Sequence, residues 1–309
     1  MSPIGQISQT ADQTDTLARG RLRAALIPDC LVEARRVANI VIAGWHGRRK
    51  RGTGDNFWQF RQFTQGESVS NIDWRKSARD DQLYVRDKEW ETAHTVWLWA
   101  DLSPSMQFQS EMSEVSKESR SLVILFALAE ILSRSGERIG IPGVMDPILA
   151  RNGAERLAQV LAHNQAQNLR NSIPDISNVK RLSDIIIISD FLGDGEEIIS
   201  QVAPVAQRGT RGHLVEVSDP AEEVFPYTGR VEFTDPETNA RLVAGKASTI
   251  AEDYSKAYKN RRVALSDEIR RMGWSYTHHR TDRQASEALA AVHGFLSGLG
   301  SNQSGGAVS

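Results

Sequence analysis

Two apolar stretches decide the fold of this chain: TVWLWADLSPS at residues 95–105 and DIIIISD at residues 184–190. Short runs that are apolar at nearly every position are typical of strands buried on both faces, as in a parallel sheet. The four consecutive isoleucines favour a strand over a short helix, because a β-branched side chain loses rotamer freedom in a helix and packs well on a sheet. Segments with helical periodicity separate these runs from further strand-like runs. The sequence therefore predicts an α/β fold, with a parallel sheet, helices on both faces and right-handed crossovers.

The other elements follow from periodicity and from turn residues. We expect strands at 138–144, 212–217 and 274–279, and Pro142 suggests that the first of these lies at a sheet edge. Two extended stretches around residues 235–239 predict a hairpin insertion at about 222–246. Helices are expected at 117–133, 154–164, 196–207, 250–272 and 286–299.

Composition also divides the chain into segments. Residues 1–28 are polar over most of their length and are expected to be disordered, as is the tail at 300–309. Residues 29–93 should hold a first helix, from Asp29 to Ala43, followed by a block rich in glycine and aromatic residues. That block is too long for an ordinary loop and is expected to form a β-type subdomain of short strands and turns. Residues 94–299 form the main domain.

Bulk properties exclude several classes of protein. The 309 residues are 40% hydrophobic and carry a formal net charge of -2, so no global charge attracts nucleic acid or membrane. Cys30 is the only cysteine, which excludes an intrachain disulfide framework and a Cys-rich zinc module. The start of the chain lacks the apolar core of a signal peptide, and no apolar run reaches the roughly 18 residues of a membrane span. The sequence predicts a cytoplasmic protein.

Polar side chains follow the two decisive strands where ligands of parallel α/β sheets gather. Asp101, Ser103 and Ser105 alternate along the chain, so their oxygens can point the same way, and Asp190 adds a second carboxylate. Hard oxygen donors with few charges suit Mg²⁺, or Mn²⁺ or Ca²⁺, better than zinc. The alternative is a turn in which these side chains only cap the next element.

This DxSxS loop and the Ser189-Asp190 strand end resemble the metal-ion-dependent adhesion site, or MIDAS, of von Willebrand A domains. The resemblance implies that Asp101, Ser103 and Ser105 are ligands, directly or through water, and that Asp190 is the distal carboxylate. The family pattern adds a threonine, but none occurs between Thr95 and Thr210. Ser172, Asn152 or water could take its place.

A second resemblance covers the block before the main domain. The ordered pieces GWHG at 44–47, GTG at 52–54, IDW at 72–74 and SAR at 77–79 are similar to the bacterial family catalogued as domain of unknown function fifty-eight. In that family the block precedes a von Willebrand A-like, Rossmann-like domain, and here the match is expected from about residue 40 to 200. The resemblance implies a partner, a MoxR-type AAA+ ATPase or its client.

The block at 44–91 has two interpretations. It is either a structural subdomain with internal ion pairs or a docking surface with Trp74, Arg61 and Arg79 as anchors. The basic cluster at 48–51 is typical of a solvated loop, and the glycines beside it lack the ending of a P-loop, so neither nucleic acid nor nucleotide is expected.

Three functions remain open from the sequence. The favoured hypothesis is a non-enzymatic adaptor whose metal leaves one coordination position for a partner carboxylate, without a catalytic residue. The second is a metal-assisted hydrolase, for which no general base or nucleophile is evident near the strand ends. The third is a metal-free scaffold with a vestigial loop, suggested by the missing threonine.

Overall fold

A computed structural model describes residues 4–46, 59–64, 68–79, 82–87, 93–163 and 173–296, with side chains from residue 20 onward except at a few positions. The expected tail at 300–309 lies outside the described residues. The chain divides into a large unit, residues 1–43 with 94–309, and a small unit, residues 44–93.

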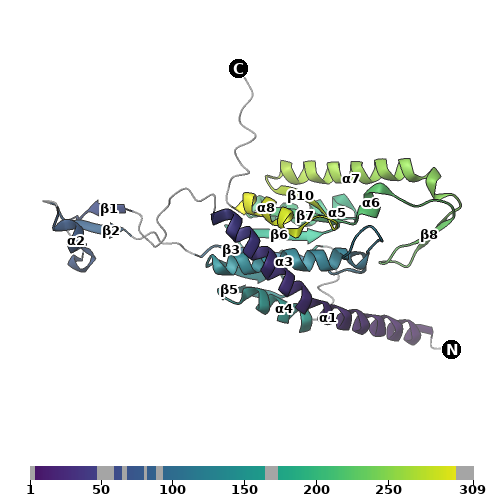
Figure 1. Ribbon diagram of the computed structural model, residues 1–309, viewed down its shortest axis with the longest axis horizontal. Coiled ribbons are helices and arrows are strands. Elements are labelled where there is room, and N and C mark those ends of the chain that lie inside the picture. Colours follow the sequence, from purple (N-terminus) through teal and green to yellow (C-terminus); the bar gives the residue numbers. More distant parts are fainter. Residues whose placement is uncertain are drawn as a thin grey trace, which may run out of the picture. The chain divides into compact units, whose positions relative to one another are not determined.

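The large unit is built on a six-stranded sheet in the order β10-β7-β6-β3-β4-β5 (Figure 1). All neighbouring strands are parallel except β4 and β5, which are antiparallel. Numbered along the chain, the order reads 3-2-1-4-5-6, that of doubly wound folds, and it reverses direction between β3 and β6. The expected Rossmann-like sheet is confirmed. The strands are β3 (Thr95–Ala100), β4 (Arg138–Ile141), β5 (Met145–Ile148), β6 (Asp184–Ser189), β7 (Arg211–Ser218) and β10 (Ser275–Arg280).

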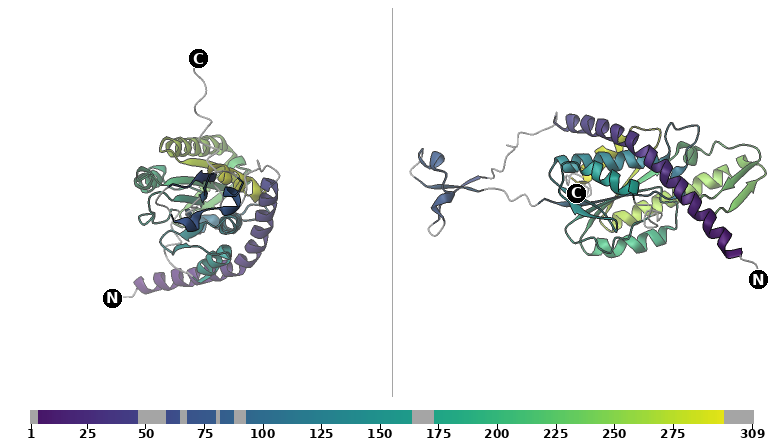
Figure 2. Two further views of the ribbon diagram at one scale, coloured as in Figure 1. Left: turned by 90° about the vertical axis from the view of Figure 1, so that its left-hand side faces the viewer. Right: turned by 90° about the horizontal axis from the view of Figure 1, so that it is seen from below.

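Helices cover both faces of this sheet. On one face α3 (Lys117–Arg134) contacts α4 (Gly153–His163) and α8 (Ala285–Leu296), and on the other α5 (Gly195–Gln207) contacts α7 (Ala251–Arg271). Figure 2 shows the two layers from the side. The short α6 (Pro220–Val224) contacts the α7 layer, and the predicted hairpin is β8 (Val231–Thr234) paired with β9 (Arg241–Ala244).

The helix α3 is the centre of the core. Its side chains are buried from Ser121 to Ser133 around the whole circumference, as expected of a helix with neighbours on every side. The sheet covers one side of it, and α1 (Ile4–His46) crosses the other: Arg134 donates to Asn39, and Arg23 pairs with Glu118.

The helix α1 corrects the expectation that residues 1–28 are disordered and that the first helix begins at Asp29. It begins at Ile4, and Pro28 lies inside it. The segment before Asp29 is held by Ile27, which is buried, and by Arg23, which pairs with Glu118 and donates to the Leu102 carbonyl. After Asp29 the helix packs through a stripe at helical spacing, comprising Cys30, Ala34, Val37, Ala38 and Val41. Burial raises the pKa of the Cys30 thiol to about 11, so this cysteine is an unreactive packing residue, as expected.

The strand β4 corrects a second expectation. It ends at Ile141 and pairs with β3 on one side and β5 on the other, so it is an inner strand. Pro142 falls in the turn that follows, where Gly143 has a positive φ of 68°. The proline of the true edge strand is Pro147, in β5, which the sequence did not predict.

The small unit is the expected β-type subdomain. It pairs β1 (Gln59–Gln62) with β2 (Tyr84–Asp87) in antiparallel register, and it carries the one-turn helix α2 (Trp74–Ser77). Asp73 caps this helix by accepting a hydrogen bond from the Lys76 amide, at 2.9 Å.

A buried histidine makes the stability of the large unit depend on pH. Burial lowers the pKa of His213 in β7 from 6.5 to about 4. Between those values the unfolded chain binds the proton more readily than the folded chain, so stability is lost as the pH falls from 6.5 to 4. We predict that this histidine contributes a loss on the order of 2–3 kcal/mol at pH 4.

Urea unfolding between pH 4 and pH 7 tests this prediction. His213→Gln should flatten the fall in unfolding free energy, whereas His163→Gln, at an exposed position on α4, should leave it unchanged. Parallel pH profiles for wild type and His213→Gln would contradict it. Some slope should remain, because burial also lowers the pKa of His279, to about 3.

Candidate functional site

The two predicted carboxylates lie at the ends of the two central strands. Asp101 directly follows β3, and its backbone amide donates to the Ile188 carbonyl at 2.8 Å, so the strand pairing continues to the loop. Asp190 follows β6, the strand next to β3. The order of the strands reverses between them, and ligands of doubly wound sheets bind at such a switch point.

Asp101 is completely buried, and each of its carboxylate oxygens accepts a hydrogen bond. Its Oδ1 accepts from the Ser103 amide at 2.8 Å, and its Oδ2 accepts from the Ser189 hydroxyl at 2.7 Å. Burial and the charge of Asp190 nevertheless raise the pKa of this carboxyl to about 7, against the lowering effect of those hydrogen bonds. The negative charge of Asp101 is therefore incompletely compensated.

The two serines of the loop stand together. The Ser103 and Ser105 hydroxyl oxygens are 3.1 Å apart, which brings them within hydrogen-bond distance of each other, as the alternation in the sequence predicted. Ser103 is buried, and Ser105 is half-buried.

Asp190 has a partner that the sequence analysis missed. Its Oδ2 accepts from the Lys117 ammonium group at 2.9 Å, and the same group lies 2.5 Å from Oε1 of Glu222 in α6. Lys117 is only 1% exposed. Burial lowers the pKa of Lys117, but the charges of Asp190 and Glu222 outweigh this effect, so the net shift is upward and the lysine remains charged.

The oxygens at this site include hard donors for a divalent cation. No cluster of three or more His, Cys, Asp or Glu side chains with metal-binding geometry occurs in the described part of the chain, which speaks against a zinc-type centre there. Asp101 with the Ser103 and Ser105 hydroxyls forms a hard oxygen set around an under-compensated carboxylate, and this fits Mg²⁺. Asp190 stands beside this set with one oxygen already held by Lys117.

The residues considered for the missing threonine do not complete the set. Asn152 precedes α4 and follows the antiparallel strand β5. It therefore lies at the end of the sheet where the parallel strands begin, whereas Asp101 lies where they end. Ser172 lies outside the described residues.

The candidate anchors of the small unit differ in exposure. Trp74 is 60% exposed at the start of α2, and Arg79 is also exposed, as docking residues must be. The Arg61 side chain is not among the described ones.

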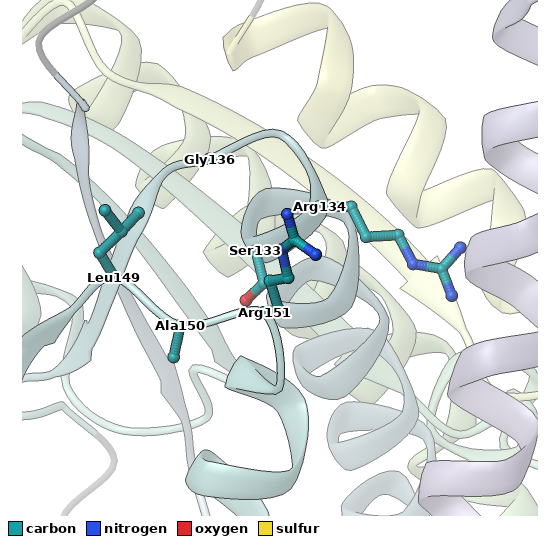
Figure 3. A pocket seen from close by; sticks show the side chains of 6 residues that line it. All are labelled: Ser133, Arg134, Gly136, Leu149, Ala150 and Arg151. Carbon is teal, nitrogen blue, oxygen red and sulfur yellow. The ribbon is translucent and has the colours of Figure 1, made fainter.

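A cavity of about 510 Å³ lies elsewhere on the large unit (Figure 3). It is lined by Gly136, which precedes β4, and by Leu149 and Arg151, which follow the antiparallel strand β5. This is the end of the sheet where the parallel strands begin, and Asp101 lies at the other end. Figure 3 shows Arg134 extending away from the other labelled side chains, in line with its bond to Asn39.

Comparison with known proteins gives the chain a family and a set of relatives. The model of the family described as "Protein of unknown function DUF58" matches residues 59–264, which begins and ends later than the predicted range of 40–200. "Uncharacterized protein Rv1480" from Mycobacterium tuberculosis is 27% identical over 79% of this chain and 80% of its own length.

Two solved structures are similar at low identity. The hypothetical protein BatB from Bacteroides thetaiotaomicron is 14% identical over 67% of this chain and 100% of its own, with a TM-score of 0.34. The SpRpn10 VWA domain is 10% identical over 71% and 100% of the two chains, with a TM-score of 0.29. Among the described helices, none has the length and apolar character that crossing a membrane requires.

The buried ion pairs of Lys117 predict a large loss of stability on their removal. Lys117→Met would leave Asp190 and Glu222 without their cation, and breaking a buried pair in this way destabilises by about 3–5 kcal/mol. Urea unfolding measures the loss.

Arg271→Met is the control, because it breaks an ion pair with Glu268 in which the two side chains are 69% and 43% exposed, and such pairs contribute about 1 kcal/mol or less. The double variant Lys117→Met with Asp190→Asn should recover part of the stability. A Lys117→Met protein as stable as the Arg271→Met protein would contradict the prediction.

Proposed function

We propose that this chain, which belongs to the DUF58 family of proteins of unknown function, has in its large unit a non-enzymatic protein-binding module. In this proposal the loop at 101–105 holds Mg²⁺, or Mn²⁺ or Ca²⁺, at the surface that meets the partner. Asp101, Ser103 and Ser105 are the ligands of the cation, and Asp190 supports it from the neighbouring strand.

The state of Asp101 is the observation that supports this proposal most. A carboxylate that is buried, close to a second carboxylate and still short of positive charge gains free energy from a cation. The two serine hydroxyls beside it supply neutral oxygens, so few protein charges face the ion. A bound cation of this kind attracts one more anionic oxygen, and an Asp or Glu side chain of a partner provides it.

A MoxR-type AAA+ ATPase or its client is the partner that we propose, on the family resemblance of the motif block. Exposed Trp74 and Arg79, with Arg61, are proposed as further contacts on the small unit. Partner binding and metal binding are then thermodynamically linked, so each strengthens the other.

Lys117 favours a second candidate, the metal-free scaffold. An ammonium group already compensates Asp190 within the site, and it could make an added cation unnecessary. The hydrolase alternative gains no such support, because the groups beside Asp190 hold each other in buried ion pairs instead of offering a free base or nucleophile.

Thermal melting with added Mg²⁺, Mn²⁺ and Ca²⁺ separates the first two candidates. A cation that binds the folded chain at 100 times its Kd stabilises it by about 2.7 kcal/mol, which raises the Tm by several degrees. We predict this rise for wild type, and its loss in Asp101→Ala and Ser105→Ala.

Asp146→Ala is the matched control, since it removes an exposed carboxylate from the edge strand β5 and should melt like wild type with each cation. If no cation raises the Tm of wild type, the metal-binding proposal is wrong and the scaffold remains. Metal-dependent hydrolysis of a phosphate or peptide substrate that is lost in Asp101→Ala would instead support the hydrolase hypothesis.

A further inference from the structure

One contact at the candidate site joins parts of the chain that are 132 residues apart. The Ser105 backbone amide donates to the Glu237 carboxylate, with 2.9 Å between the nitrogen and Oε1. Glu237 lies in the turn between β8 and β9, so a carboxylate from this chain already sits on the DxSxS loop.

The hairpin turn holds Glu237 in a defined position. Asp235 accepts from the Glu237 amide at 2.9 Å and from the Thr238 hydroxyl, and its own amide donates to the Ala240 carbonyl at 2.8 Å. Pro236 restricts the backbone further, and Asn239 closes the turn with a φ of 59°. A carboxylate presented by an ordered turn loses little conformational entropy when it binds.

The base of the hairpin is fixed to the large unit, while its tip is exposed. Phe233 of β8 stacks against Phe225 with ring centroids 5.8 Å apart, and Phe225 packs on Tyr254 of α7 at 4.7 Å. Every residue from 235 to 241 is exposed. The tip can therefore leave the loop without disturbing the core.

We infer that the DxSxS loop recognises a carboxylate carried by an ordered turn, and that Glu237 is its resident occupant. This inference rests on the proposed function for the identity of the competing ligand, an acidic turn of a partner protein. Such a partner has to displace the hairpin tip to reach the Ser105 amide.

Site-resolved hydrogen exchange of the full chain in EDTA tests the resident contact without any metal or partner. We expect the Ser105 amide to exchange at least tenfold faster in Glu237→Ala than in wild type, because a charge-assisted hydrogen bond protects it. Glu232→Ala is the matched control: it removes a carboxylate from the same hairpin, where Glu232 pairs with Arg241, and should leave the Ser105 rate unchanged. Equal rates in all three proteins would overturn the inference.

A variant with a shortened turn tests recognition itself. Thr234 and Arg241 are the last paired residues of the hairpin, so Asn-Gly in place of residues 235–240 gives a two-residue turn that keeps β8 and β9. The probe is the capped hexapeptide of residues 235–240, followed through the Ser105 amide resonance. We expect a saturable shift in the shortened variant, and a Glu-to-Gln peptide or wild-type protein should require at least tenfold more peptide.

Equal responses to the two peptides would overturn the inference. Because these measurements contain EDTA, they separate it from the metal proposal. Slow Ser105 exchange together with no cation effect on the Tm would support the contact between Ser105 and Glu237 and contradict the metal-binding proposal. Unprotected Ser105 together with a cation effect would do the reverse.

Discussion

The structure depends on how buried negative charge is compensated where β3 and β6 end. Two adjacent parallel strands deliver Asp101 and Asp190 to one edge of the sheet, and both side chains are removed from water. Carboxylates in such surroundings need hydrogen bonds or cations, because desolvation destabilises their charged form. Ser103, Ser189 and Lys117 meet part of this need, and in the proposed function a divalent cation meets the rest.

This constraint also explains why elements far apart in the sequence meet at the site. Lys117 comes from the start of α3, the central helix of the core, and Glu222 comes from α6, which follows β7 in the chain. Glu237 reaches the loop from the hairpin between α6 and α7. The central strands, the central helix and an insertion thus all contribute residues to the site. A change in its charge therefore alters the ion pairs of Lys117 in the core and the hydrogen bond of Glu237 at the hairpin tip.

The sequence predicted what depends on local pattern. The runs at 95–100 and 184–188 were sufficient for the parallel sheet, and the alternation at 101–105 for the paired serine hydroxyls. What it missed depends on contacts between distant residues. Nothing local marks Lys117 as buried, since a lysine in the first turn of a helix is normally solvated, and nothing local pairs Glu237 with Ser105. The part of α1 after Asp29 was predicted from the sequence, whereas the part before it was missed because that segment is polar and Pro28 argues against a continuous helix.

The central claim is that a divalent cation binds beside Asp101, and crystals soaked in Mn²⁺ test it directly through anomalous scattering. We predict one strong peak with oxygen ligands from Asp101 and the two loop serines, while Lys117 stays on Asp190. A map in which the loop carries no peak, with Mn²⁺ absent or bound elsewhere on the molecule, would contradict it.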